Sequence, residues 1–347
     1  RKSLVYRKGP EMRRFSVLLT LATLFTNRLC ASADDTSRPG GVASCGACQD
    51  CCADVDSIPG DPDLTLSTGC TGFVEPESLW DNLSIFAGLE GSKQPQDYGV
   101  NAHFGGRVSA NLGLPLCKHI GLGLQIGTSI NYTDNAVQVF DRLGEVSGRS
   151  QSFTTLGVFQ RLDNGVVWAA AWDFLHQNYF DQTNLSQARG RIGWQFGNEE
   201  IGIRAQVSHD SDRAFFLGAI PVVLEPVSQG ALYWARTWEN AARTTLWLGI
   251  AESHGERNVA FEALLMDPNQ RPSGERVLFG AEVDIPLSDH WSLFGQANFI
   301  TPAYTGTVDS YLGVAFYPGG GARRARTNRY APVQPVANST SMSIDLR

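Results

Sequence analysis

The most regular feature of the chain is an alternation of apolar and polar positions that begins near residue 80. Every second position from Val100 to Leu114 is apolar or glycine, and the positions between them are polar or glycine. The segment from Ile120 to Asn131 repeats this pattern, with Thr128 on its apolar side. Side chains that alternate in this way are typical of β-strands whose two faces meet different surroundings.

The same pattern predicts twelve strands, most of them about long enough to cross a bilayer at a tilt. Their predicted ranges are 82–91, 98–115, 119–131, 149–161, 165–176, 185–196, 200–209, 227–238, 243–252, 275–285, 290–300 and 309–317.

The connections between these strands alternate in length. Short turns are expected at 116–118, 162–164, 197–199, 239–242 and 286–289. Longer loops are expected at 92–97, 132–148, 177–184, 210–226, 253–274 and 301–308. An even number of strands with short turns on one side indicates an all-β fold, an antiparallel transmembrane β-barrel of the outer membrane, with both ends on the periplasmic, short-turn side. The alternative is a soluble, exported β-sandwich that binds a partner, in which one strand face meets water.

Aromatic residues support the barrel, because they gather where the strands end. Five lie near the short turns, namely Trp80, Phe196, Trp238, Trp291 and Tyr317. Three lie toward the long loops, namely Tyr98, Tyr132 and Phe299. Such girdles are expected at the two membrane interfaces. No stretch of about 18 uninterrupted apolar residues occurs, so the sequence predicts no transmembrane helix.

Three short segments carry a family resemblance: residues 155–161, with the sequence TLGVFQR, residues 194–196, WQF, and residues 200–202, EIG. They resemble an uncharacterised family of bacterial outer-membrane barrels with cysteine-rich leaders, over residues 80–317. The resemblance implies a barrel in the outer membrane, with membrane lipid and the outer-membrane assembly machinery as partners. It implies no activity, since these motifs are strand patterns.

The beginning of the chain has the features of a signal peptide over residues 1–33, within which Met12 is a candidate start. Arg13 and Arg14 precede an apolar run over 15–25, and an Ala-x-Ala pattern ends at Ala33. Residues 1–33 hold seven of the 28 basic and one of the 35 acidic residues, so the formal net charge without them is −13 rather than −7. An acidic exported protein is not expected to bind nucleic acid.

A cysteine-rich, acidic segment over 34–79 is predicted to be a periplasmic leader. The cysteines that remain after cleavage are Cys45, Cys48, Cys51, Cys52, Cys70 and Cys117. An even number of cysteines in an exported protein favours disulfides, although six cysteines leave the pairing open. The spacing Cys45-x-x-Cys48-x-x-Cys51 also suits metal ligands. We expect disulfides, and no metal or other cofactor.

The polar strand face predicts which side chains line the lumen. They are Asn101, His103, Arg107, Asn111, Gln125, Asn131, Arg189, Arg191, Gln195, Arg204, Gln206, Glu282, Asp284, Gln296 and Asn298. Arg189, Arg191 and Arg204 come from adjacent predicted strands, where unscreened guanidinium groups would repel one another. They form either a selectivity patch in a narrow pore or ion pairs with Glu282 and Asp284 across the lumen.

His209 and Ser211 are the only candidate catalytic residues, at the long-loop end of the seventh predicted strand. An imidazole and a hydroxyl two positions apart share a strand face. They resemble the His-x-Ser of outer-membrane phospholipases, although Asp212 stands where that family has asparagine. That departure weakens the match, and ordinary loop-entry composition is the favoured explanation, so we expect no enzyme activity.

The last segment, 318–347, opens with Pro318 and three glycines and carries Arg323, Arg324, Arg326 and Arg329. It is predicted to be a flexible, basic, proline-containing periplasmic extension that could touch an anionic cell-wall polymer. Taken together, the sequence predicts a narrow channel or a structural component of the envelope, with an outer-membrane lipid hydrolase as the enzyme alternative.

Overall fold

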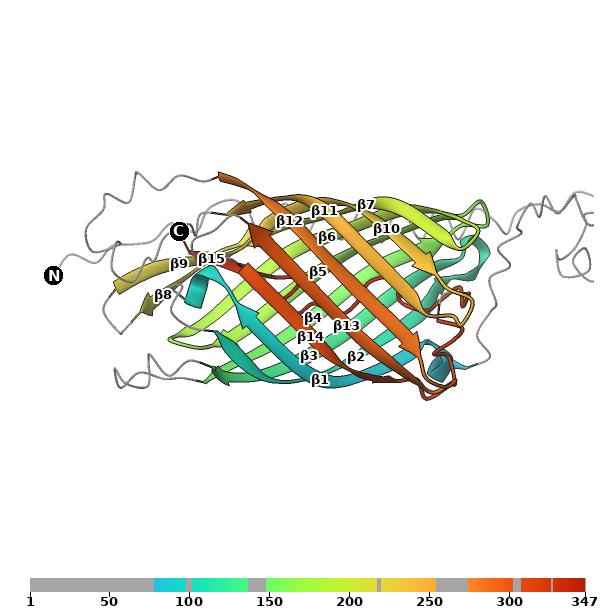
Figure 1. The fold of residues 1–347 in the computed structure, drawn as a ribbon, viewed down its shortest axis with the longest axis horizontal. Helices are drawn as coiled ribbons and strands as arrows, with labels where there is room; N and C mark the ends of the chain where they lie inside the picture. The colour runs from blue at the N-terminus through green and yellow to red at the C-terminus, as the bar shows by residue number, and fades with distance from the viewer. Residues whose placement is uncertain are drawn as a thin grey trace, which may run out of the picture. The chain divides into compact units, whose positions relative to one another are not determined.

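The computed structural model describes residues 78–97, 102–136, 148–216, 220–253, 274–301, 307–325 and 327–346. Twelve of its strands close into one barrel (Figure 1). They are β1 (Leu83–Lys93), β2 (His103–Cys117), β3 (Leu122–Asn135), β4 (Arg149–Arg161), β5 (Val166–Asn178), β6 (Gln182–Phe196), β7 (Glu199–Asp210), β10 (Ser228–Thr237), β11 (Arg243–Ser253), β12 (Gly274–Pro286), β13 (Trp291–Thr301) and β14 (Thr307–Phe316).

All the pairings between neighbouring barrel strands that the structure defines are antiparallel. The barrel closes where β1 pairs with β14, from Ile85 opposite Phe316 to Lys93 opposite Val308. On its other side β1 pairs with β2, and β7 pairs directly with β10. Closure leaves no strand edge in the barrel, so backbone groups in the wall find partners within it.

The outer face of the barrel is apolar. Ile203, Leu232 and Leu248 lie abreast in the middle of three neighbouring strands, and each is more than half exposed. Other large exposed apolar side chains on the barrel strands include Leu89, Phe104, Val108, Ile130, Ile192, Ile201, Val207, Ile250 and Leu312. A continuous apolar surface of this size requires a lipid rather than an aqueous environment. The protein is therefore an outer-membrane β-barrel, and the soluble sandwich is wrong.

Most turns match the predicted lengths. Gly165, with φ +87°, and Gly197, with φ +55°, provide left-handed turn positions on the short-turn side, where glycine is favoured. One predicted long loop is wrong: β5 ends at Asn178 and β6 begins at Gln182, so only three residues separate them. Ala102, expected within a strand, precedes β2.

Exposed aromatic side chains lie where the strands end. Trp80, Trp238 and Trp291 lie at the short-turn end, and Tyr132 lies toward the other end. This distribution is typical of the two membrane interfaces. The described residues also form the 3₁₀ turns η2 (Leu79–Asn82), η3 (Pro95–Asp97) and η4 (Lys118–Ile120). No helix in the described ranges is long and apolar enough to cross a membrane.

A second, smaller sheet was not predicted. It consists of β8 (Asp212–Phe216), β9 (Ile220–Pro226) and β15 (Ile344–Leu346), with β9 in the middle. β8 and β9 extend from the long-loop end of the barrel, in a segment predicted to be a loop (Figure 1). β15 comes from the end of the chain, so the C-terminal segment reaches the long-loop end rather than staying on the short-turn side.

Several predictions lie outside the described residues. These concern the signal peptide, the leader with Cys45, Cys48, Cys51, Cys52 and Cys70, and the lumen residue Asn101. Cys117, at the end of β2, is the sixth candidate cysteine, and the disulfides stay predictions.

Candidate functional site in the barrel lumen

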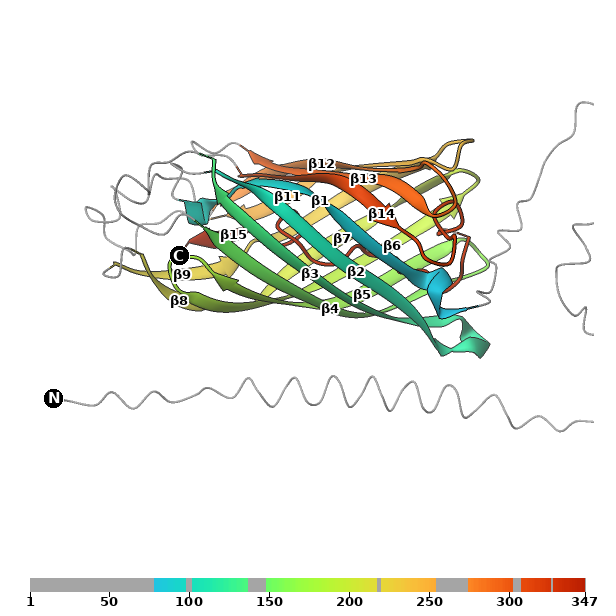
Figure 2. The ribbon, with the colours of Figure 1, turned by 90° about the horizontal axis from the view of Figure 1, so that it is seen from below.

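The chain after β14 turns back into the barrel. Near the short turns, the Gly319 amide donates to the Trp80 carbonyl at 3.2 Å, and the Ala322 amide donates to the Asp289 carbonyl at 2.9 Å. The Asn328 side-chain amide then donates to Asn82 Oδ1 at 2.6 Å, inside the mouth of the barrel. Figures 1 and 2 show this last part of the chain, in red, surrounded by the barrel wall.

We call residues 328–346 the lumen tail. Its middle part is held by polar side chains of the wall. The backbone carbonyl of Gln334 accepts from Asn111 Nδ2 at 3.0 Å and from Gln125 Nε2 at 2.7 Å. The Arg161 guanidinium donates to the Ala331 carbonyl. These wall residues come from the neighbouring strands β2, β3 and β4, so one side of the barrel binds the tail backbone through hydrogen bonds.

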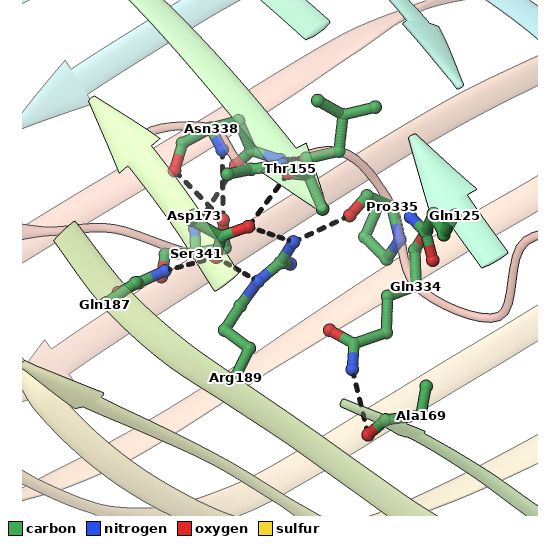
Figure 3. A network of polar contacts seen from close by, with 12 residues as sticks. Gln125, Thr155, Ala169, Asp173, Gln187, Arg189, Gln334, Pro335, Asn338 and Ser341 are labelled. Carbon is green, nitrogen blue, oxygen red and sulfur yellow. Dashed lines mark hydrogen bonds and ion pairs between the residues drawn. The ribbon is translucent and has the colours of Figure 1, made fainter. Parts of the chain in front are cut away.

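Figure 3 shows the network where the tail passes β4, β5 and β6. Asp173 is fully buried and forms an ion pair with Arg189. Arg189 Nη2 also donates to the Pro335 carbonyl at 3.0 Å. Thr155 Oγ1 donates to Asp173 at 2.8 Å and accepts from the Ala337 amide at 2.9 Å. The polar wall side chains and the tail backbone thus provide each other with hydrogen-bond partners.

The last part of the tail crosses to the opposite wall. Ser339 Oγ donates to Glu90 in β1, and Ser343 Oγ donates to Asp309 in β14 at 2.7 Å. Thr340 Oγ1 lies 2.9 Å from Gln296 Oε1 in β13. The tail ends as β15, whose residues pair with β9 from Ile344 opposite Pro226 to Leu346 opposite Leu224.

The prediction of a flexible periplasmic tail is therefore wrong for this segment. Residues 337–346 are all buried, and the tail forms hydrogen bonds with wall strands on several sides of the lumen. A buried backbone needs hydrogen-bond partners, and the polar lumen supplies them. Two arginines of the predicted basic extension have carboxylate partners: Arg329 lies 2.6 Å from Asp163, and Arg323 lies 3.5 Å from Asp289.

The structure places the described members of the predicted lumen set inside the barrel. Those that are buried are His103, Arg107, Asn111, Gln125, Asn131, Arg189, Gln206, Asp284, Gln296 and Asn298. Those that line cavities and are half-buried are Arg191, Gln195, Arg204 and Glu282. The lumen is thus shared between wall side chains and the tail.

The three neighbouring arginines have different environments. Arg189 pairs with Asp173, and Arg191 Nη2 lies 2.6 Å from Glu200 Oε1. Arg204 stacks on Trp247, with its guanidinium carbon 4.5 Å from the ring centroid. Arg189 and Arg191 do not form the predicted ion pairs with Glu282 and Asp284, because they pair with Asp173 and Glu200 instead. Arg204 is the arginine that Glu282 attracts.

Several charged lumen residues were missed from the sequence. They are Glu90, Asp97, Arg149, Arg161, Asp173, Glu200, Arg243 and Asp309. The residues of this set that lie within strands could have been found from the sequence, because each occupies a position on the polar face of its strand. Asp173 follows Ala169 and Ala171 at a spacing of two, on the face opposite Trp172 and Phe174.

One missed group is a buried cluster toward the long-loop end. His103 Nε2 lies 3.1 Å from Asp97 Oδ1 and 3.0 Å from the Tyr179 hydroxyl. Arg149 Nη1 lies 3.4 Å from the same Asp97 oxygen. These contacts fix η3 against the barrel, and the adjacent Gln94 bonds to the tail at Ser339 and Ile344.

His209 lies on the outer side of β7 at a β-bulge, with the ring of half-exposed Trp172 in an edge-to-face contact with its imidazole. Its Nδ1 is 3.1 Å from Asp210 and 3.4 Å from the hydroxyl of Ser186, a residue not singled out from the sequence. Ser186 itself donates to Asp210 at 2.6 Å. A nucleophile needs its hydroxyl to donate to the imidazole, so the Ser186 contact is not a catalytic arrangement. Hydrolysis through Ser211 stays an alternative that experiment must decide.

Among the residues that the structure describes, two cavities lie between the tail and the wall. The larger, of about 160 Å³, lies toward the short-turn end and is lined by wall residues and by Pro332, Val333 and Gln334 of the tail. The smaller, of about 40 Å³, lies beside Arg204 and Pro335. In the larger one Glu200 accepts hydrogen bonds from Arg191, from Arg243 at 2.6 Å and from the Tyr233 hydroxyl at 2.5 Å.

These features define an outer-membrane barrel whose lumen holds its own C-terminal segment. The chain belongs to the Family of unknown function (DUF6666), whose model matches residues 82–344. The match covers the barrel and continues through the tail almost to its end. No curated protein matches the chain.

Among solved structures, the COG4313 outer membrane channel from Pseudomonas putida F1 has a TM-score of 0.48 and 10% identity, over 71% of this chain and 97% of that one. The translocator domain of the autotransporter NalP from Neisseria meningitidis has a TM-score of 0.41 and 9% identity, over 68% and 89%. Outer membrane phospholipase A from Escherichia coli has a TM-score of 0.36 and 9% identity, over 67% and 95%. These likenesses carry no information about what this chain does.

Proposed function

We propose that this protein is a narrow outer-membrane channel that its own lumen tail holds closed. The observation that carries the proposal is the way the tail is held. Its contacts in the middle of the lumen are hydrogen bonds with polar wall side chains, through Gln334, Pro335, Ala337 and Ser341. Water can replace such bonds when the tail leaves, which leaves a polar, charged lumen able to pass solutes.

The apolar contacts of the tail are concentrated at its end. Met342, Ile344 and Leu346 pack with Val222 and Leu224 of β9 in one buried cluster. This cluster and the β15 pairing fix the end of the tail at the long-loop side, while the middle of the tail has mainly polar contacts. The arrangement suits a plug with one anchored end better than a continuous structural core.

Removal of the tail tests the proposal. The full chain and a chain ending at Gly321 are reconstituted in planar bilayers, after heat-modifiable gel mobility shows that both barrels are folded. We expect the full chain to be almost silent and the shortened chain to show discrete conductance steps. A matched variant, Arg323→Gln, changes an exposed residue before the tail and is expected to stay silent.

A second variant guards against misfolding of the shortened barrel. Gln334→Pro keeps the chain length but alters the tail backbone at the residue held by Asn111 and Gln125. We expect it to raise the frequency of conductance steps above that of the full chain. If folded barrels of both variants stay silent, the lumen is closed by the wall itself and the protein is a structural component of the envelope.

A further inference from the structure

The larger lumen cavity combines room for a small solute with a buried arginine that is held by neutral groups. At about 160 Å³ the cavity is close to cavities of roughly 150 Å³ that accept benzene, so a solute of that size fits. It lies between the wall and the tail, and Arg161, the last residue of β4, is one of the side chains that line it.

Arg161 is only 7% exposed, and its hydrogen bonds to described residues all come from Nη1. The acceptors are the backbone carbonyls of Ala331 and, at 3.4 Å, of Arg329, both in the tail. Within the described ranges Arg161 thus forms no ion pair, and its Nε and Nη2 remain as donors beside the cavity. A buried cation without a counter-charge favours an anion next to it.

The nearest charges do not supply that counter-charge. Glu200 attracts Arg161, whereas Arg191 and Arg243 repel it. Glu200 already accepts hydrogen bonds of 2.6 Å from each of these two arginines. Asp284 lies opposite Arg243 in the register of β11 and β12 and adds a second negative charge. Three guanidinium groups therefore share two carboxylates, and one positive charge is left over.

The other carboxylates around the cavity do not remove this excess. Glu282 is attracted to Arg204, which lies beside the smaller cavity. Asp81 lies at the short-turn mouth, where its Oδ2 accepts from the Ser78 amide at 2.9 Å. Arg107 also lines the larger cavity and adds to its positive side. The cavity is therefore expected to attract anions and to repel cations.

The shape and lining of the cavity narrow the kind of anion. The flat fork of a guanidinium group matches the two oxygens of a carboxylate, and the tail carbonyls show that Arg161 accepts planar oxygen partners here. Apolar side chains complete the lining through Phe86, Val167, Pro332 and Val333. A carboxylate with a short apolar chain would satisfy both parts of this lining.

We infer that the larger cavity binds a small monocarboxylate, with its carboxylate group on Arg161 and its apolar chain against the neighbouring wall and tail. The inference rests on the proposed function, since it names the solute class of the same lumen.

Binding to the full chain in detergent micelles, measured by isothermal titration at neutral pH, tests this inference without any conductance measurement. The probe is propionate, and the control is propionamide, which has nearly the same shape but no charge. We expect propionate to bind at least tenfold more tightly than propionamide. Arg161→Gln should lower the propionate affinity to that of propionamide, whereas Arg236→Gln, an exposed change on β10, should leave it unchanged.

A variant with the opposite sign strengthens the test. Glu200→Gln removes the carboxylate that attracts Arg161, so it should raise the propionate affinity. Heat-modifiable gel mobility shows first that each variant barrel is folded.

Equal affinities for propionate and propionamide would overturn the inference, as would unchanged propionate binding by folded Arg161→Gln protein or weaker binding by folded Glu200→Gln protein. The outcome is separate from that of the proposed function. If propionate binds preferentially but the shortened chain does not conduct, the site stands and the channel falls. If the shortened chain conducts but propionate binds no better than propionamide, the channel stands and the carboxylate site falls.

Discussion

Replacing Asp173 by alanine is the most direct test of how the barrel wall holds the lumen tail. The Asp173 carboxylate is fully buried and pairs with Arg189, and it also accepts from Thr155 and from Gln187 at 2.9 Å (Figure 3). Arg189 is 5% exposed and donates to the tail at Pro335. The substitution leaves a buried guanidinium without its counter-charge beside the tail backbone.

The expected loss can be worked from these contacts. Removing one partner of a buried ion pair typically costs about 3–5 kcal/mol, because the remaining charge stays desolvated. The three charge-assisted hydrogen bonds, each worth about 1.5–3 kcal/mol, are part of that figure and do not add to it. We therefore expect Asp173→Ala to lower the free energy of unfolding by about 3–5 kcal/mol.

Urea unfolding in lipid vesicles, followed by tryptophan fluorescence, measures this loss. Asp173→Ala combined with Arg189→Met removes both charges and should recover most of the stability, since the pair is worth little against apolar side chains. Asp181→Ala, an exposed change in the β5–β6 turn, should stay within about 0.5 kcal/mol of the wild type. A loss below about 1 kcal/mol for Asp173→Ala would refute the reasoning, because no buried pair would then hold the tail.

The other predictions concern the membrane, the topology and the enzyme alternative. Leu248→Arg, in the middle of β11 on the outer face, should lower the free energy of unfolding by about 2–4 kcal/mol in the same assay. The control Phe215→Arg in β8 should lower it by less than about 1 kcal/mol, and equal losses would contradict a lipid-facing outer surface. Epitope tags between β8 and β9 and after residue 347 should both bind antibody on intact cells, because the tail crosses the barrel. Labelling of the β8–β9 tag alone would show that the tail does not span the lumen. The purified protein should release no fatty acid from phospholipid vesicles, and a release that Ser211→Ala abolishes would establish the hydrolase.

The barrel wall was predictable because its two faces meet different solvents. The alternation alone predicts a strand over 149–161, and β4 spans Arg149–Arg161. The predicted count of twelve strands and the all-β barrel class are confirmed. Strand ends were harder to predict: β5 and β6 extend toward each other until only three residues join them, since nothing in a polar segment marks where pairing stops.

The tail could not be predicted by the same reasoning. Residues 338–341 are Asn, Ser, Thr and Ser, a composition that favours a solvated linker. Hydrophobic patterning detects burial against apolar surfaces, whereas this segment is buried against Glu90, Gln151 and Gln187. β8 and β9 were missed for a related reason, because their apolar residues pack on a strand, β15, that lies more than a hundred positions away.

One signal for the tail is nevertheless present in the wall, at inward positions that carry no side chain. A Cβ at Gly127 would lie 2.6 Å from Val336 Cγ2, and one at Gly113 would collide with the Tyr330 carbonyl. Both glycines alternate with outward apolar residues, so in an empty, water-filled lumen nothing would require them to be small. Glycine weakens a strand unless a close approach needs it. The two positions therefore indicate that the wall is shaped for the tail that passes inside it, and Gly113→Ala or Gly127→Ala should displace the tail while leaving the strand pairing intact.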